Sequence, residues 1–417
     1  MKKRDKKNIE NSPRFTKLQP PKIKILGVGG GGSSIVEEIS KIIKKERLPF
    51  LSKIEFIAAN VDLQAINSLK RNLKTIYFGE DVTFGLGCGM NVNLGREAAL
   101  KSKDKFEKEF KKTDFCILIS SLGGGTGSGA SPVIAQILHQ LKIPTLGIFT
   151  LPFKFEGTKR LEIAKNSLKA MAPFLNGYAV IPNQKVFNIV QPQTSLQGSL
   201  SLINKFLAEI IKSLLETIYL PGFINIDFAD IKSILNQKGE KVYLATATVK
   251  GKNKKEKAIK EIFKNPLFSH KELVFEKILL NVMPSSDISM KELEEICEEV
   301  YKRNPRAKII FGISKNLSQH NTLKILLLAV LKKPSKPKVK KRKEVKKEET
   351  KKAEEKKEKP KTIQKKGKKG AKKKPRKKEI TRRNALDVHQ LLKETEKELI
   401  EEEKKWEVPA FLKKKSS

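Results

Sequence analysis

The chain has 417 residues, and its 38% hydrophobic content suffices for a folded core in part of its length. Its formal charge of +41 is spread unevenly, because residues 332–378 carry 26 Lys and Arg against six Asp and Glu. Three cysteines without C-x-x-C spacing and four scattered histidines argue against a zinc site and indicate a reducing compartment. No run approaches the roughly 18 apolar residues of a membrane span, so we expect a cytoplasmic protein without a transmembrane segment.

From Lys22 onward, short apolar runs alternate with helical patterns. The runs at 22–28, 54–60, 115–121 and 145–151 are almost continuously apolar, which is typical of strands that are covered on both faces. The alternation predicts an α/β fold, with a parallel, Rossmann-like sheet that has helices on both sides. Loops that leave the carboxyl ends of parallel strands emerge at one edge, so loops distant in sequence can line one site.

Three glycine-rich segments are expected at that edge. "GVGGGGSS" (27–34) follows the first strand, "GLGCGMN" (85–91) precedes a helix predicted over 94–110, and "LGGGTGSGA" (122–130) follows the fourth apolar run. Glycine lets backbone N–H groups approach a phosphate closely, and the N-terminus of a following helix adds its dipole. Thr126 and Ser128 would add hydroxyl donors. Tight turns with close helix–strand packing are the alternative interpretation of the first and last segments, and N-capping of the following helix by Asn91 is that of 85–91.

A dinucleotide-dependent oxidoreductase is a weaker interpretation of the first glycine segment. It would need an acidic residue about 20 residues after the glycines. Asp62 comes 30 residues after Gly32, and the P-loop pattern GxxxxGK[ST] is absent. We therefore expect a phosphate site of neither standard type.

A long helix and a second, smaller α/β domain are predicted after the first sheet. Residues 200–220 have a helical apolar period, and apolar strand patterns follow at 241–251, 276–284, 307–314 and 323–331. Between them, "NIDFAD" places two carboxylates three residues apart at a helix start. Asp227 and Asp230 could share a face and position a water, or Asp227 could simply cap the helix.

These motifs together resemble the tubulin/FtsZ family of GTPases. "GGGTGSG" (123–129) is that family's signature, and segments in the family's order span residues 21–331, from "KILGVGGGG" to "GFINIDFADIKSIL". The resemblance implies GTP and GDP as ligands, with Mg²⁺ held mainly by phosphates and water. It also implies a homopolymer, a head-to-tail protofilament that organises the cell-division septum, in which each subunit completes the active site of its neighbour.

The resemblance assigns roles only to matching residues. The catalytic loop would consist of Asn225, Asp227 and Asp230, which would act on the nucleotide of the next subunit. Guanine would be bound by Asn183, and the ribose and phosphate region by Glu156 and Arg160. The remaining nucleotide contacts would be Gly29, Gly30, Gly31, Gly32, Ser34, Asp62, Gly87, Gly89, Asn91, Gly123, Gly124, Gly125, Thr126, Gly127, Ser128, Gly129 and Asn204.

The sequence departs from the family pattern at three places. Ser33 and Ser34 stand where the first glycine segment usually ends in an asparagine, which predicts weaker phosphate binding. Lys205 stands where the family usually has an aspartate against guanine, so either Asn204 takes that role or base selectivity is relaxed. Val61 replaces a frequent threonine. A scaffold of the same fold with weak or lost turnover is therefore the alternative function.

The segments outside the predicted domains are strongly charged. The lysine-rich stretch lacks aromatic residues, and we interpret it as a spacer, with weak contact to nucleic acid or anionic lipid as the alternative. "WEVPAFLKKK" resembles the family's C-terminal peptide, which docks on membrane-tethering division proteins and would bring filaments to the inner face of the cell membrane. The predicted organisation is 1–20 basic arm, 21–199 GTP-binding domain, 200–220 central helix, 221–331 C-terminal domain with the catalytic loop, 332–379 disordered linker, 380–405 marginal helix and 406–417 partner-binding peptide.

Overall fold

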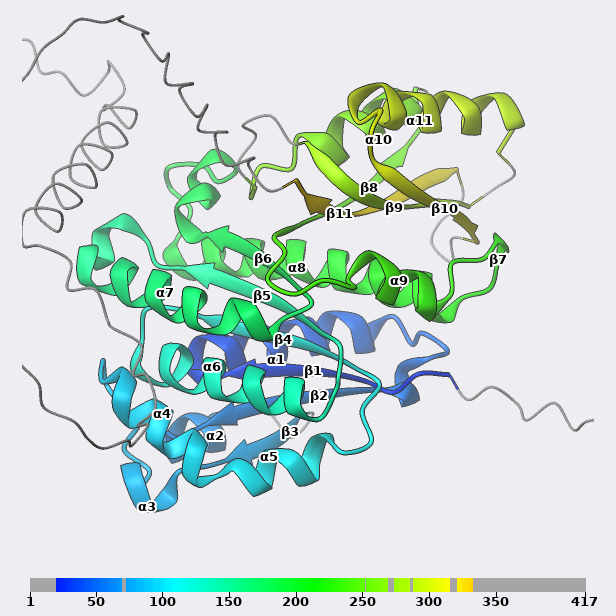
Figure 1. The fold of residues 1–417 in the computed structure, drawn as a ribbon. Helices are drawn as coiled ribbons and strands as arrows, with labels where there is room; N and C mark the ends of the chain where they lie inside the picture. Colours follow the sequence, from blue (N-terminus) through cyan, green and yellow to red (C-terminus); the bar gives the residue numbers. More distant parts are fainter. Residues whose placement is uncertain are drawn as a thin grey trace, which may run out of the picture. The chain divides into compact units, whose positions relative to one another are not determined.

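Six parallel strands form the larger of two sheets in the structure, a computed structural model that describes residues 20–69, 73–251, 253–268, 274–285, 288–315 and 321–332 (Figure 1). They lie in the order β3-β2-β1-β4-β5-β6. The strand order reverses between β1 and β4, where the following loops diverge and form a crevice that binds ligands in many such sheets. The strands are β1 (Ile23–Val28), β2 (Ile54–Asn60), β3 (Lys74–Tyr77), β4 (Phe115–Ser121), β5 (Thr145–Leu151) and β6 (Gly177–Pro182).

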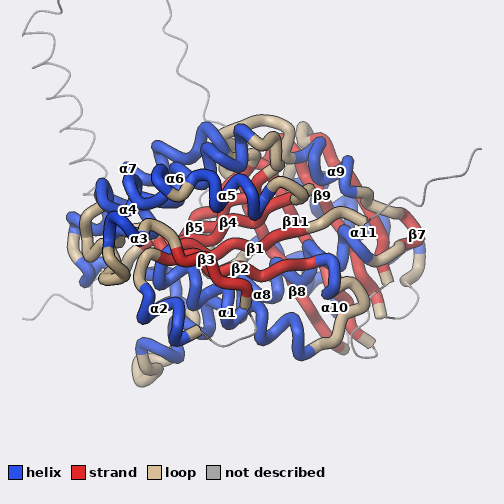
Figure 2. The backbone as a smooth tube through the Cα atoms, turned by 90° about the horizontal axis from the view of Figure 1, so that it is seen from below, coloured by secondary structure: helices blue, strands red, loops and turns tan. Residues whose placement is uncertain are grey.

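Helices cover both faces of this sheet, and successive strand residues point to opposite faces (Figure 2). Ile25 of β1 belongs to the apolar cluster of the face covered by α1 (Gly29–Lys45) and α8 (Leu196–Tyr219). Its neighbour Leu26 belongs to the cluster of the opposite face. That face is covered by α4 (Val92–Lys101), α5 (Lys103–Phe110), α6 (Gly125–Gln140) and α7 (Thr158–Met171), while α2 (Leu63–Ser68) and α3 (Glu80–Thr83) are short connecting helices.

Helix α8 runs from the carboxyl edge of the large sheet to its amino edge. Its N-cap Ser195 accepts a hydrogen bond from Gly198 N at 3.1 Å, so the helix begins before the expected residue 200. Near its other end, the Tyr219 hydroxyl donates to the carbonyl of Pro21, just before β1, at 2.6 Å. With 24 residues, α8 is about 36 Å long. The helix therefore spans the large sheet from the carboxyl ends of its strands to their amino ends.

The second sheet is mixed and has the order β7-β10-β9-β11-β8. Strands β9 and β10 are parallel, and the other neighbours are antiparallel. One apolar cluster contains residues of α8, of the large sheet and of this second sheet, so α8 packs against both. The elements are β7 (Gly222–Ile224), α9 (Phe228–Ile234), β8 (Val242–Lys250), α10 (Lys254–Phe263), β9 (Phe275–Pro284), α11 (Met290–Arg303), β10 (Lys308–Ser314) and β11 (Thr322–Leu331).

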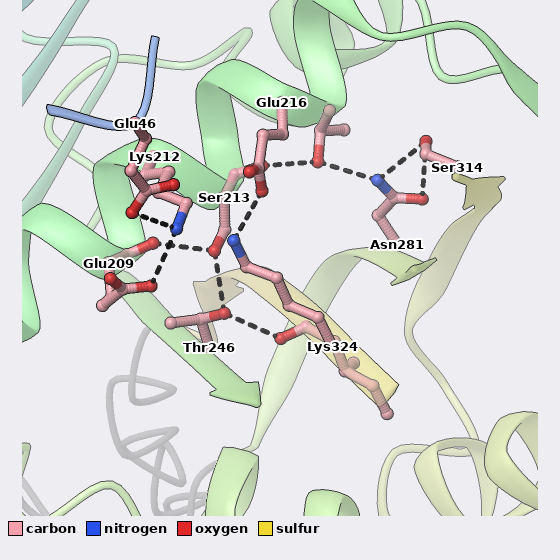
Figure 3. A network of polar contacts seen from close by, with 11 residues as sticks. Glu46, Glu209, Lys212, Ser213, Glu216, Thr246, Asn281, Ser314 and Lys324 are labelled. Atoms are coloured by element: carbon pink, nitrogen blue, oxygen red, sulfur yellow. Dashed lines mark hydrogen bonds and ion pairs between the residues drawn. The ribbon is translucent and has the colours of Figure 1, made fainter. Parts of the chain in front are cut away.

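Buried charges link α8 to the second sheet and to the end of α1 (Figure 3). Lys324 of β11 is 1% exposed and donates to Glu216 of α8, 2% exposed, at 2.5 Å. One helical turn earlier, Lys212 pairs with Glu46, the C-cap residue of α1, at 2.7 Å. Burial lowers the pKa of Lys324, although the charge of Glu216 acts in the opposite direction. These ion pairs fix the position of α8 relative to both neighbours.

The structure confirms the predicted fold class, with a parallel Rossmann-like sheet, a long helix and a second, smaller sheet. The helix predicted over 94–110 is interrupted, because Ser102 leaves helical geometry and its hydroxyl accepts a hydrogen bond from Gly79 N at 2.9 Å. Within the described ranges, no helix is long and apolar enough to cross a bilayer. Most of the basic arm and almost all of the predicted linker, marginal helix and C-terminal peptide lie outside the described residues.

Candidate functional site

The first glycine run forms the opening turn of α1 instead of a loop. Strand β1 ends at Val28 and the helix begins at Gly29, whose φ of +75° strongly favours glycine. A methyl group on Gly31 would lie 2.5 Å from Ser121 Oγ, and one on Gly32 would lie 2.8 Å from Ile119 O. The run therefore lets the start of α1 approach β4 closely, and its first N–H groups lack partners within the helix.

The signature segment 123–129 turns the chain from β4 into α6. Gly123 has a φ of +113°, and its N–H donates to Ser128 Oγ at 2.8 Å. The N-cap Gly124 has no side chain to bond the first N–H groups of α6. A methyl group on Gly29 would lie 2.9 Å from Gly127 N, so the openings of α1 and α6 touch. Two helix N-termini thus meet at the crevice, where both dipoles favour a bound anion.

The third glycine segment closes the same crevice. Gly125 N donates to Gly89 O at 3.0 Å, which joins residues 85–91 to the start of α6. Asn91 caps α4 by accepting hydrogen bonds from Asn93 N and Leu94 N at 3.0 and 3.2 Å. Asp62 caps α2 by accepting from Ala65 N at 2.9 Å, and it borders Gly87. Residues 29–32, 87–91 and 123–128 together form the cradle.

The predicted ribose and guanine residues lie on neighbouring strand ends. Glu156, the last residue of the 3₁₀ turn Lys154–Glu156 after β5, accepts a hydrogen bond from Arg160 Nη1 at 2.7 Å. The Arg160 carbonyl would be 3.2 Å from a methyl group on Gly123, so this pair adjoins the cradle. Asn183 directly follows β6 and opens the 3₁₀ segment η4 (Asn183–Asn188), which packs against α8. Asn204 lies on α8 and donates to Glu38 of α1 at 2.7 Å.

Several predicted ligand contacts already have packing or hydrogen-bond partners within the chain. A methyl group on Gly129 would overlap the Val92 carbonyl, so this glycine serves the packing of α6 on α4. The Ser128 hydroxyl is buried and bonded to Gly123 N, and the Ser34 hydroxyl donates to Gly30 O at 3.0 Å. Thr126 bonds the thiol of Cys88, whose pKa burial raises. Direct contacts from Ser34, Thr126 and Ser128 to a ligand remain predictions.

Gly30, Gly89 and Gly124 face open space, since no atom lies within 4 Å of a methyl group placed on them. We expect Gly124→Asp to fold normally, because Asp is a preferred N-cap residue. Its carboxylate should lower affinity for GDP at least about 100-fold by repelling phosphate at close range. Gly124→Asn, whose side chain has the same shape without the charge, should lose much less affinity for GDP. Calorimetric titration with GDP measures both, and equal losses would contradict an anion site.

The predicted catalytic residues do not lie at the cradle. Asn225, Asp227 and Asp230 follow the far end of α8, and Phe228 beside them contacts Phe115, the first residue of β4, with ring centroids 5.8 Å apart. The cradle begins only after the last residue of β4. Asp227 and Asp230 form a capping box, with Asp230 N donating to Asp227 Oδ1 at 2.8 Å and Asp227 N to Asp230 Oδ2 at 3.0 Å. Within one chain, they are at the opposite edge of the sheet.

Sequence reasoning missed Glu38 and Ser201, which lie between the cradle helix α1 and α8. The Ser201 hydroxyl and the Asn204 amide both donate to the carboxylate of Glu38. No local pattern marks these residues, because the contact joins positions more than 160 residues apart. Lys324 and Glu216 were also missed, although a charge inside an otherwise apolar run is a visible signal.

Comparisons with known proteins identify the family of this chain. Residues 22–191 match the family model of the Tubulin/FtsZ family, GTPase domain, and residues 241–330 match that of the FtsZ family, C-terminal domain. Cell division protein FtsZ of Buchnera aphidicola is 31% identical over 309 residues, covering 74% of this chain and 78% of the relative.

Solved structures show the same fold. An FtsZ dimer of M. jannaschii is similar with a TM-score of 0.66 and 30% identity, covering 75% of this chain and 89% of that one. CetZ2 of Haloferax volcanii, solved as a GTPγS-bound protofilament, is 20% identical with a TM-score of 0.63, covering 74% of this chain and 93% of that one. At that identity the likeness concerns the fold alone. Two family models match most of the folded part of the chain, and a curated FtsZ relative is 31% identical over 74% of the chain, so the chain belongs to the FtsZ family of tubulin-like GTPases.

Proposed function

We propose that the cradle binds GTP and that the carboxylates of a second copy of the chain complete the site that hydrolyses it. As an FtsZ family member, the chain is a GTPase of the cell-division cytoskeleton that forms homopolymers. The observation that carries the shared site is the separation of its two halves by a helix about 36 Å long. Hydrolysis then depends on contact between two copies.

The cradle supplies the chemistry of phosphate binding. Its donors would be the N–H groups at the starts of α1 and α6 that lack a partner within their helix, apart from Gly125 N, which donates to Gly89 O. Such donors suit phosphate oxygens and not a cation. Mg²⁺ would therefore bind through phosphate oxygens and water, and it would neutralise charge on the γ-phosphate. Arg160 and Glu156 would hold the neighbouring ribose and phosphate region. Asn183, with an amide that can both donate and accept, would contact the guanine edge.

The carboxylates of the catalytic loop would orient a water and would not form a covalent intermediate. In the capping box, Asp227 uses Oδ1 and Asp230 uses Oδ2, so capping occupies one oxygen of each carboxylate. The other oxygens could accept hydrogen bonds from a water and orient it toward the γ-phosphate of the next subunit. Capping and catalysis are thus compatible roles, and the cap would hold both carboxylates in one orientation.

Exposed apolar side chains lie beside the catalytic loop and beside the cradle. They support a head-to-tail contact between two copies of the chain. Phe223, on the strand that leads into the catalytic loop, is 83% exposed, and Phe84 and Leu86, beside the third glycine segment, are 79% and 87% exposed. Burial of such residues favours association. Because the two surfaces differ, their contact is heterologous and continues into a filament instead of closing a dimer.

Phosphate release and sedimentation, measured together over a series of protein concentrations, test this function. Both signals should rise above one shared concentration threshold with GTP. A scaffold that does not turn over is the second candidate, favoured by the Ser34 hydroxyl, which bonds within its own helix. It would sediment equally with GTP and GDP and release no phosphate. Phosphate release proportional to concentration, without a threshold, would contradict the shared site.

The C-terminal peptide 406–417 would connect filaments to membrane-tethering division proteins at the inner face of the cell membrane. Val408, Phe411 and Leu412 offer apolar anchors for a groove, and Lys413 to Lys415 suit an acidic rim or anionic lipid. The lysine-rich stretch before it would act as a spacer, with weak lipid or nucleic-acid contact as a salt-dependent addition. Many weak tails along one filament would act together.

We expect deletion of 406–417 to leave GTP-driven assembly unchanged, because the cradle and the catalytic loop are intact. The same deletion should abolish recruitment to the division site, which fluorescence microscopy of the tagged protein in cells can measure. A deletion of equal length inside 332–379 serves as the control. Normal recruitment of the protein that lacks 406–417 would show that the peptide is not the anchor.

A further inference from the structure

A half-buried carboxylate joins the cradle helix to α8 beside the predicted guanine residues. Glu38 lies on α1, four residues and thus one turn after Ser34. Its Oε2 accepts from Asn204 Nδ2 at 2.7 Å, and its Oε1 accepts from the Ser201 hydroxyl. Asn204 and Ser201 both lie near the start of α8, which packs against η4, the segment that begins at Asn183. The three side chains form a bridge between α1 and α8.

The bridge decides which end of the Asn204 amide remains for a ligand. An ionised carboxylate can only accept hydrogen bonds, whereas an amide has a donor end and an acceptor end. Asn204 must therefore turn its NH₂ group toward Glu38, as the structure has it. Its Oδ1 is then the end that points away from Glu38. A neutral partner at position 38 would allow either orientation of the amide.

An oriented acceptor is what guanine recognition requires. The guanine edge presents the N1–H and N2–H₂ donors, whereas adenine has an acceptor at N1 and no amino group at C2. An amide oxygen satisfies guanine and leaves adenine N1 facing a like acceptor, which is unfavourable when water is excluded. Lys205, the exposed neighbour of Asn204, is a cation and cannot accept from these donors.

We propose that Glu38 is a positioning residue for base specificity, which holds Asn204 so that its Oδ1 accepts from guanine. The inference rests on the proposed nucleotide site and adds that the acidic group behind guanine selectivity lies on α1, not on α8. Glu38 acts through Asn204, because its carboxylate bonds Asn204 and Ser201 in the structure.

The test compares dissociation constants for GDP and ADP, measured by calorimetry on the full-length, nucleotide-free protein. Glu38→Gln should lower the preference for GDP over ADP by about 3- to 10-fold, the range for one hydrogen bond. Glu37→Gln is the matched control on the same helix turn. Glu37 pairs with Lys41 at 2.9 Å, and its loss should leave the preference unchanged.

A pair of further variants separates positioning from loss of structure. Asn204→Asp alone should weaken GDP binding, because it places a second carboxylate within hydrogen-bond distance of Glu38. Combined with Glu38→Gln, the same change should restore the preference, since a carboxylate at 204 accepts from guanine and bonds the new amide. Damage to the fold would be cumulative, so it cannot produce this reversal.

The outcomes separate a positioning role of Glu38 from the absence of such a role and from failure of the proposed nucleotide site. Restored preference in the double variant supports the positioning role. An unchanged preference in Glu38→Gln, or a double variant as poor as Glu38→Gln, overturns the inference while GDP binding by the wild type keeps the proposed function. Wild-type protein that binds neither nucleotide would overturn the proposed function, and the inference with it.

Discussion

Asp230→Ala is expected to lower GTP hydrolysis at least about 100-fold, the usual contribution of a positioned acid or base group. Affinity for GDP should stay within about two-fold of the wild type, because Asp230 lies at the opposite edge of the sheet from the cradle. Phosphate release above the assembly threshold measures the first quantity, and calorimetry the second. Hydrolysis at the wild-type rate would show that the carboxylate has no catalytic role in this chain.

The capping box requires a second variant at the same position. Ala removes the carboxylate and also the hydrogen bond that Asp230 accepts from Asp227 N at 3.0 Å. Asn keeps an oxygen for that bond and loses only the charge. We expect Asp230→Asn to assemble like the wild type and to be as inactive as Asp230→Ala. If Asn restored hydrolysis, the role of Asp230 would be the structure of the loop.

Lys324→Ala is expected to lower the free energy of unfolding by about 3–5 kcal/mol, because it leaves the carboxylate of Glu216 buried without its counter-ion. The second oxygen of that carboxylate, Oε1, already has no hydrogen-bond partner within the described residues. The exposed pair of Lys302 with Glu298, at 3.0 Å on α11, provides the control. Lys302→Ala should leave the free energy of unfolding almost unchanged, because exposed ion pairs contribute little. Urea unfolding at a fixed GDP concentration measures both.

Replacing both buried partners tests whether the ion pair itself is needed for stability. Glu216→Leu with Lys324→Met substitutes apolar side chains of similar volume, and it should recover most of the stability lost in Lys324→Ala. A double variant as unstable as Lys324→Ala would mean that the ion pair itself contributes the lost stability, because the double variant has neither an isolated charge nor a missing side chain. Non-additivity of the two single changes would measure their coupling directly.

The fold was predictable where burial controls the sequence. Strands β2, β4 and β5 coincide with apolar runs, because both faces of the sheet are covered and nearly every position must be apolar. The start of α1 was not predictable from propensity, since four glycines disfavour a helix and only contact with β4 imposes one. The break at Ser102 was not predictable either. It accompanies the hydrogen bond from Gly79 N to Ser102 Oγ, which no local sequence pattern shows.

The residues of the candidate site were likewise predictable only in part. Glycines whose methyl groups would collide with backbone, and carboxylates at a helix start, leave a mark in the sequence because few other residues can replace them there. The bridge of Glu38, Ser201 and Asn204 leaves none, since its residues are ordinary on helix surfaces and gain their role only when α1 and α8 meet. The signature motif also does not show which of its glycines support the loop and which face open space. The structure does, because a methyl group on Gly129 would collide with backbone and one on Gly124 would not.

Mixing two inactive variants tests the shared site most directly. Gly124→Asp should bind nucleotide only weakly but keeps its catalytic loop, whereas Asp230→Asn should bind GTP but lacks the carboxylate. Each alone should release almost no phosphate. In an equimolar mixture, the intact loop of the first would meet the GTP of the second, so phosphate release should reappear above the assembly threshold. If the two proteins sediment together with GTP and still release no phosphate, the active site is not divided between copies.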